Sequence, residues 1–315
     1  MVTQIEATDV LTCPRPTVAR IVPSGVSPVS GRGPALRSNG RGDNIMISRR
    51  PGIPGRIPDA VIIEPRQSRG ERPLVSVHGI ARDVPGMADG LANAAQATGR
   101  TIVLPVFDKD HWPRYQRAAC PARADHALLA LLSSLEAEGR IPRGPVDMSG
   151  FSGGAQFAHR FTWLYPNRVA RLSVASAGWW TFPDQDTAYP FGIGPERTGP
   201  SAAPFCFRTN LRAFLDRDIA IRVGARDCVV DDKTRSGPRI DAQQGRDRLT
   251  RARTWATALR AASRALNMPD RVDFAILPDC GHSFTDCADA GLTGVFLDFG
   301  HNRPSGLHSC GRTCA

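Results

Sequence analysis

The sequence has no long hydrophobic run, almost no lysine and no CxxC pair, and each absence excludes a class of protein. No apolar stretch reaches the roughly eighteen residues needed to span a bilayer, so a membrane-spanning protein is not expected. The first thirty residues lack a basic start followed by an apolar stretch, which argues against a secretory signal and predicts a cytoplasmic location. The eight cysteines match no zinc-binding pattern, so no metal site is predicted.

The net charge of +10 comes almost entirely from arginine, since only Lys109 and Lys233 among the 40 basic residues are lysine. Half of this charge lies in residues 1–58, and the remainder is dispersed along the chain. A nucleic-acid module would need a concentrated basic face with aromatic side chains that stack on bases. We therefore predict no nucleic-acid partner and no membrane partner. The sequence leaves the oligomeric state open.

The composition changes near residue 58. Residues 1–57 are rich in proline, glycine, serine and arginine and have no sustained apolar period, which predicts a disordered extension. Residues 58–302 are predicted to form one folded domain, and residues 303–315 a short tail. Within the domain, residues 184–216 are rich in proline and glycine, which predicts a long irregular insertion that acts as a lid.

Segments typical of strands and helices alternate from residue 59 onward. Short runs rich in β-branched residues predict strands at 59–65, 73–79, 101–107, 145–149, 169–175, 218–224 and 271–277. Helical spacing predicts helices at 86–98, 124–138, 153–165 and 246–267. The last helix is expected to turn most of its arginines to solvent, namely Arg248, Arg251, Arg253, Arg260 and Arg264. This alternation predicts an α/β fold with a mainly parallel central sheet flanked by helices.

The strongest local motif is Gly150-Phe-Ser152-Gly-Gly154, which fits G-x-S-x-G. A strand is predicted before it and a helix after it. A sharp strand-to-helix turn is the setting in which a serine is held exposed in a strained conformation, and flanking glycines leave room for the turn. The sequence therefore predicts that Ser152 is a catalytic nucleophile.

A serine nucleophile needs a histidine base that is held by a carboxylate. Among the seven histidines, His282 directly follows the last predicted strand. Asp227 lies at the carboxyl end of the strand 218–224, and the nearby Asp231 and Asp232 are alternatives to it. The predicted triad is Ser152, Asp227 and His282. The cysteines around these residues, Cys228, Cys280 and Cys287, leave room for a disulfide that steadies the catalytic loops.

The oxyanion formed during acyl transfer needs two backbone N–H donors. One is expected from Gly153, next to the nucleophile. The other is expected from the loop that follows His78-Gly79, at Ile80 or its neighbour Ala81. His78 is expected to brace this loop rather than to transfer a proton.

Four motifs in this order resemble those of the α/β-hydrolase superfamily: Val77-His-Gly79, Gly150-Phe-Ser-Gly-Gly154, Gly224-Ala-Arg-Asp227 and Gly281-His-Ser-Phe284. Within that superfamily, residues 149–160 look like the corresponding stretch of esterases related to polyhydroxybutyrate depolymerases. The resemblance covers roughly residues 59–300. It implies an α/β-hydrolase fold, an ester-cleaving serine enzyme and no cofactor.

A small-molecule or oligomeric ester is therefore the predicted substrate. Aromatic residues near the expected carboxyl edge of the sheet are candidates for its pocket: Trp112, Tyr115, Trp179 and Trp180. Ordinary packing is the alternative for these four. A thioesterase or serine peptidase with the same triad remains open, as does a non-catalytic protein that uses its basic extension.

Overall fold

The computed structural model describes residues 44–67, 70–119, 121–195, 203–231 and 234–297. Within them lies a sheet of eight strands in the order β1-β2-β4-β3-β5-β6-β7-β8. The strands are β1 (Ile45–Arg50), β2 (Asp59–Pro65), β3 (Leu74–Val77), β4 (Ile102–Val106), β5 (Val146–Phe151), β6 (Val169–Ala175), β7 (Asp218–Gly224) and β8 (Val272–Leu277). The helices are α1 (Val84–Thr98), α2 (Ala124–Ala137), α3 (Gly153–Leu164), α4 (Ala203–Thr209), α5 (Leu211–Leu215), α6 (Pro238–Gln244), α7 (Arg248–Ala265), α8 (Phe284–Asp289) and α9 (Leu292–Leu297), with short 3-10 turns η1 (Tyr115–Arg117) and η2 (Pro166–Arg168).

The strands β4, β3, β5, β6, β7 and β8 run parallel to one another. β2 is antiparallel to β4, and β1 is antiparallel to β2 at the edge of the sheet. β3 is central: Leu74 pairs with Ile102 of β4 on one side and with Asp147 of β5 on the other. Its four residues are all buried, because parallel strands carry helices on both faces. All the parallel strands end at one edge of the sheet, which is where such sheets place their sites.

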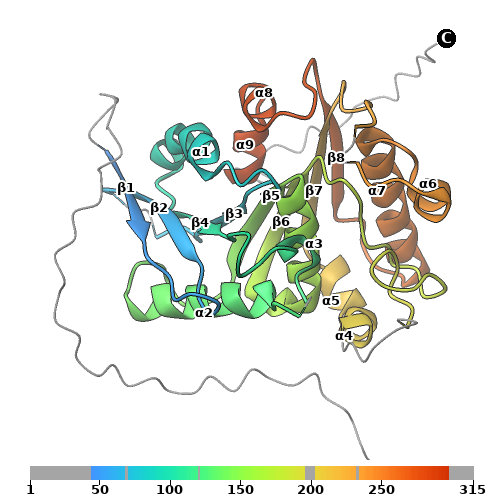
Figure 1. Cartoon of the computed structure of the whole chain (residues 1–315), viewed down its shortest axis with the longest axis horizontal. Coiled ribbons are helices and arrows are strands. Elements are labelled where there is room, and N and C mark those ends of the chain that lie inside the picture. The colour runs from blue at the N-terminus through green and yellow to red at the C-terminus, as the bar shows by residue number, and fades with distance from the viewer. Residues whose placement is uncertain (1–43, 68–69, 120, 196–202, 232–233, 298–315) are drawn as a thin grey trace, which may run out of the picture. The chain divides into compact units, whose positions relative to one another are not determined.

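Helices cover both faces of the sheet. In Figure 1, α1, α8 and α9 lie on one side of the strands, and α2 and α3 lie on the other. On the first face, Met87 and Leu91 of α1, Leu104 of β4 and Phe296 of α9 belong to one hydrophobic cluster. No helix in the described part of the chain is long and apolar enough to cross a membrane.

The predicted alternation of strands and helices is confirmed. Each of the seven predicted strands and four predicted helices is present, with ends that differ by at most two residues. The helix predicted at 86–98 begins earlier, at Val84, because the Asp83 side chain caps it by accepting the Gly86 N–H. It ends where Gly99 takes a left-handed conformation with a φ of 69°.

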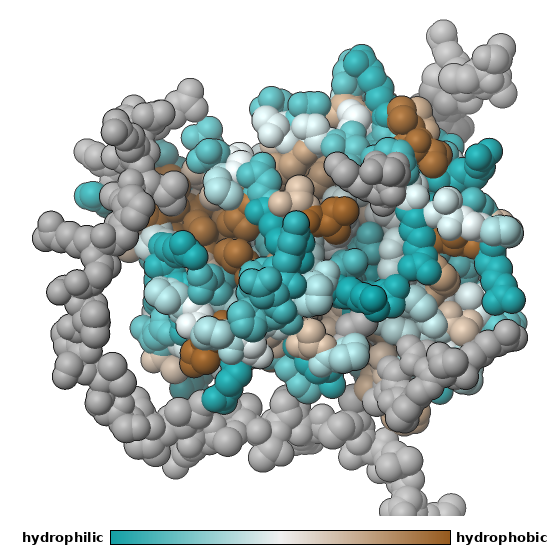
Figure 2. Space-filling view, in the orientation of Figure 1, coloured by the Kyte–Doolittle hydropathy of each residue, from teal (hydrophilic) through white to brown (hydrophobic). Residues whose placement is uncertain are grey.

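The expected boundary of the folded domain is wrong at its N-terminal side. Residues 45–50, assigned to the disordered extension 1–57, form β1 and pair with β2 from Ile45↔Pro65 to Arg50↔Ala60. As an edge strand, β1 leaves Met46 54 % and Ile47 40 % exposed, and hydrophobic side chains reach the surface on this side of the sheet (Figure 2). Residues 1–43 and the tail 303–315 lie outside the described residues.

The insertion predicted at 184–216 is not irregular throughout. Residues 203–215 form α4 and α5, and residues 196–202 lie outside the described part. Trp163 of α3 stacks on Phe214 of α5 with ring centroids 4.4 Å apart, and its indole N–H donates to the Phe207 carbonyl. These two helices are therefore fixed against the C-terminal half of α3. Their action as a lid stays a prediction.

Candidate active site

Ser152 lies in the turn between β5 and α3, with a φ of 54° and a ψ of −115°. A non-glycine residue in such a conformation costs about 1–3 kcal/mol, so the surrounding structure must hold it. The flanking glycines make this turn possible by close approach. A Cβ on Gly150 would lie 2.4 Å from the Gly154 backbone, and a Cβ on Gly154 would lie 1.9 Å from the Val77 carbonyl oxygen.

The structure brings the three predicted triad residues into one hydrogen-bonded chain. Ser152 Oγ lies 3.0 Å from His282 Nε2, and His282 Nδ1 lies 2.9 Å from Asp227 Oδ2. Asp227 is 2 % exposed and Ser152 is 8 % exposed, whereas the His282 side chain keeps 25 % of its surface accessible. The carboxylate is thus shielded from water while the base faces the site.

Each partner of Ser152 is carried by the loop that leaves a parallel strand. Asp227 follows β7, and its carbonyl oxygen accepts the Leu249 N–H in the first turn of α7. His282 follows β8, and Ser283 directly after it caps α8 by accepting the Asp286 N–H. The ring of Phe151 lies 5.3 Å from the imidazole of His282 and fixes one side of it.

The cysteines around these loops are free thiols. Cys280 and Cys287 are buried on either side of His282, and Cys228 is exposed beside Asp227. The disulfide for which the sequence left room is therefore not formed in this structure.

The expected oxyanion donors lie next to each other. Gly153 opens α3, where backbone N–H groups have no acceptor within the helix. The Ile80 nitrogen lies 3.2 Å from the position that a Cβ on Gly153 would occupy. Ala81 is one residue further along the same loop. The structure thus places the backbones of Gly153 and Ile80 next to each other, and their role as oxyanion donors stays a prediction.

His78 and Tyr115 brace the loop that carries Ile80. His78 Nδ1 donates to the Gly79 carbonyl and its Nε2 accepts the Phe107 N–H, so the imidazole is a neutral tautomer. Burial lowers the pKa of His78 to about 4. The Tyr115 hydroxyl donates to the His78 carbonyl oxygen at 2.6 Å. These contacts fit the bracing role expected for His78.

A buried arginine, which helical spacing predicts to face solvent, contacts the carboxylate of the triad. Arg248, the first residue of α7, is 2 % exposed, and its guanidinium contacts Asp227 Oδ1 at 3.5 Å and Asp231 Oδ1 at 3.0 Å. Burial opposes ionisation of Asp231, but hydrogen bonds from Thr234 and Arg248 outweigh it and lower the pKa of Asp231 to about 2. Asp231 therefore holds the arginine, while Asp227 holds the histidine. Asp232, the other alternative, lies outside the described residues.

The prediction that the arginines of the helix at 246–267 face solvent is wrong at Arg248 and Arg251. Arg251 is fully buried, like Arg248, and donates to the Gly178 carbonyl and to Asp241. Helical periodicity alone does not reveal such residues, because it carries no information on which loop or helix will supply their partners.

The four aromatic side chains predicted to line the substrate pocket are buried. Trp112 and Tyr115 are each 1 % exposed, and Trp180 has no exposed surface because it stacks on Trp255 at 4.1 Å. A side chain without accessible surface cannot contact a ligand in this conformation, so the pocket prediction is wrong for these three. Trp179 is 5 % exposed, and its ring centroid lies 4.0 Å from the guanidinium carbon of Arg160 and 6.0 Å from that of Arg235.

No protein-family model matches the chain, and no curated protein matches its sequence. Solved structures do resemble it. Poly(aspartic acid) hydrolase-1 from Sphingomonas sp. KT-1 has a TM-score of 0.67 and 22 % identity, covering 81 % of this chain and 98 % of that one. LpqC, a poly(3-hydroxybutyrate) depolymerase from Bordetella parapertussis, has a TM-score of 0.63 and 25 % identity, covering 76 % of this chain and 83 % of that one.

An S-formylglutathione hydrolase from Staphylococcus aureus is also similar, with a TM-score of 0.51 and 14 % identity over 82 % of this chain and 97 % of that one. Together with the strand order, these likenesses establish that the chain has the α/β-hydrolase fold. The fold class implied by its motifs is thereby confirmed.

Proposed function

We propose that the protein is a serine hydrolase that cleaves carboxylic esters through an acyl-enzyme, in the manner of the esterases related to polyhydroxybutyrate depolymerases. The observation that carries this proposal is the chain from Ser152 Oγ through His282 to Asp227, with spacings of 3.0 and 2.9 Å. Such a chain lets an imidazole take the serine proton as the hydroxyl attacks a carbonyl.

In the first half of the reaction, Ser152 Oγ attacks the ester carbonyl while His282 Nε2 accepts its proton. The buried Asp227 carboxylate keeps the Nδ1 proton in place and stabilises the imidazolium that forms. The Gly153 and Ile80 N–H groups donate to the oxyanion of the tetrahedral intermediate. The imidazolium then protonates the departing alcohol, and an acyl-Ser152 ester remains.

In the second half, water replaces the alcohol. His282 accepts a proton from that water as it attacks the acyl carbonyl, and then returns the proton to Ser152 Oγ as the carboxylic acid leaves. Each proton that the imidazole accepts is returned within the same cycle, so these side chains and backbone donors suffice for hydrolysis.

The test is labelling with a fluorophosphonate probe followed by peptide mapping, together with turnover of p-nitrophenyl butyrate. The label should fall on Ser152, and Ser152→Ala should lose nearly all turnover while its circular dichroism and thermal unfolding stay those of the wild type. Retained turnover in Ser152→Ala would contradict the proposal. Matched ester, thioester and amide substrates then separate an esterase from a thioesterase or peptidase.

A further inference from the structure

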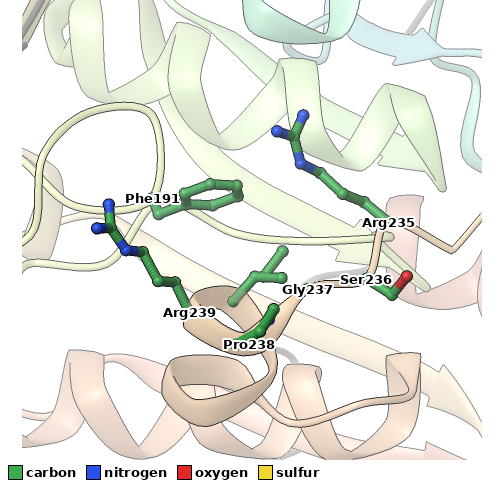
Figure 3. Close-up of a pocket in the computed structure, with 7 residues that line it drawn as sticks. Phe191, Arg235, Ser236, Gly237, Pro238 and Arg239 are labelled. Carbon is green, nitrogen blue, oxygen red and sulfur yellow. The ribbon is translucent and has the colours of Figure 1, made fainter.

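A pocket of about 370 Å³ lies outside the triad, between the segment that carries Phe191 and the start of α6. Its walls include Ile240 and the Phe191 ring, which are apolar, and the side chains of Arg235 and Arg239. Figure 3 shows the two arginine side chains on either side of the Phe191 ring. The guanidinium carbon of Arg235 lies 5.2 Å from the centroid of that ring. The volume is in the range of sites for small molecules.

The charge of this pocket is not balanced by the described part of the protein. Within the described residues, neither Arg235 nor Arg239 has an ion-pair partner. The nearby carboxylates are held elsewhere, Asp231 by Arg248 and Asp241 by Arg251. Burial and the charge of Arg117 both lower the pKa of Arg235, which places a third guanidinium in the same neighbourhood.

The pocket is built from segments that leave the same edge of the sheet as the catalytic turn. Phe191 lies in the segment after β6 and Arg235 in the segment after β7, and these two strands are parallel neighbours. The guanidinium carbon of Arg235 is 6.0 Å from the ring centroid of Trp179, which also follows β6. β5, the parallel neighbour of β6 on its other side, ends directly before Ser152.

We propose that the pocket formed by Phe191, Arg235 and Arg239 binds a carboxylate carried by the ester substrate, several bonds away from the scissile carbonyl. This inference rests on the proposed function and specifies its substrate class. Guanidinium groups bind carboxylates through paired, charge-assisted hydrogen bonds, and the Phe191 ring offers an apolar surface to the methylene groups beside the carboxylate. The substrates that fit are acid-bearing esters, such as monoesters of dicarboxylic acids and ester chains that end in a free acid.

The experiment compares two p-nitrophenyl esters of suberic acid, one with the far carboxyl group free and the other with it methylated. The two esters have the same leaving group and the same chain length. The ratio of their kcat/KM values therefore isolates the effect of the carboxylate charge. Because hydrogen bonds to charged groups are among the stronger ones, the wild type should favour the free acid by about 10-fold. The variant with both Arg235→Gln and Arg239→Gln should bring the ratio near one.

Arg253→Gln is the matched control, because Arg253 is an exposed arginine of α7 away from the pocket. It should leave the ratio unchanged, and circular dichroism with thermal unfolding should show that all variants are folded. Should the double variant not fold, the single variant Arg239→Gln takes its place. A wild-type ratio near one, or a ratio that survives the arginine substitutions, overturns the proposal.

Failure of the proposed function can be distinguished from failure of this inference. If the proposed function is wrong, the fluorophosphonate probe does not label Ser152 and neither ester is turned over. In that case calorimetric titration of Ser152→Ala protein with suberate tests the pocket without turnover. Binding that disappears with Arg235→Gln and Arg239→Gln supports the pocket, and absence of binding to Ser152→Ala protein overturns it.

Discussion

Arg248 holds its guanidinium 3.5 Å from the oxygen of Asp227 that faces away from His282. The other oxygen of Asp227 faces the imidazole at 2.9 Å. One buried carboxylate is therefore shared between the Arg248 guanidinium and the imidazole that the proposed reaction uses as its base. Arg248 fixes the rotation of this carboxylate and so keeps its other oxygen on the imidazole.

Arg248→Gln should therefore lower kcat. Without the guanidinium, the Asp227 carboxylate loses a contact that fixes its rotation, and looser placement of the imidazole should cost roughly 10-fold in kcat. Breaking a buried ion pair should also lower the free energy of unfolding by about 3 kcal/mol. The measurements are steady-state turnover of p-nitrophenyl butyrate and urea unfolding. Arg253→Gln, which removes an exposed arginine from the same helix, should alter neither, and an unchanged kcat in Arg248→Gln would rule out this role.

Replacing Asp227 should harm activity far more than replacing Asp231. Asp227→Asn keeps the shape but loses the charge and the correct tautomer of His282, which costs about four orders of magnitude in kcat in a well-studied triad. Asp231 contacts Arg248 and Thr234 rather than the imidazole, so Asp231→Asn should cost less than about 10-fold, since its partly buried contacts do not touch His282. Steady-state turnover of p-nitrophenyl butyrate compares the two. The reverse order of effects would mean that the carboxylate has been assigned to the wrong position.

Asp231 should also contribute to stability against acid. Its pKa is lowered to about 2 in the folded protein, from a usual value of 3.8. Because the pKa of Asp231 is lower in the folded than in the unfolded protein, its ionised form stabilises the fold above about pH 4. This stabilisation is lost as the pH falls from about 4 toward 2. Because 37 % of the Asp231 side chain is exposed, the contribution should stay below about 1 kcal/mol. As the pH is lowered from 4 to 2, the thermal unfolding temperature of Asp231→Asn should fall less steeply than that of the wild type. Asp289→Asn, at an exposed position of α8, is the control that should leave the slope unchanged.

Tyr115→Phe should slow catalysis with little change in KM. The hydroxyl of Tyr115 donates to the His78 carbonyl and so holds the loop that carries Ile80. Looser placement of one oxyanion donor should cost about 10-fold in kcat, which is less than the loss of a donor itself. Tyr165→Phe is a matched control, because Tyr165 also loses a 2.6 Å hydrogen bond, to Asp125, away from the site. Equal effects of the two substitutions on kcat would show that Tyr115 acts on stability alone.

The strands and the triad positions follow from local sequence patterns. The central strands β3 and β4 are short runs rich in apolar residues that are almost wholly buried, and such runs stand out in composition. The glycines that its turn requires predict the position of Ser152. Asp227 and His282 are predictable because they directly follow strands, at the edge where parallel strands end.

The features that sequence could not predict depend on contacts with other elements of the fold. β1 lies at the sheet edge and pairs with one neighbour, so none of Ile45–Arg50 is fully buried. Arg248 and Arg251 are buried because Asp227 and Asp231, in the segment after β7, and Asp241, in α6, pair with them. Trp180 is buried because Trp255, 75 positions later in the numbering, stacks on it. Helical periodicity carries no information on which loop will meet a given arginine or tryptophan.

Trp180→Ala should therefore affect stability rather than substrate binding. The indole stacks on Trp255 with an interplanar angle of 10° and has no exposed surface, and the Trp180 backbone exchanges hydrogen bonds with the Gln244 side chain. Removal of a buried tryptophan leaves a cavity, and the free energy of unfolding should fall by about 3–5 kcal/mol. Trp180→Phe keeps a ring against Trp255 and should lose less. The KM for p-nitrophenyl butyrate, measured below the unfolding temperature of each variant, should stay within about twofold of the wild type because no ligand reaches the indole. A KM that rises about tenfold while the unfolding free energy is unchanged would restore Trp180 to the substrate pocket that the sequence predicted.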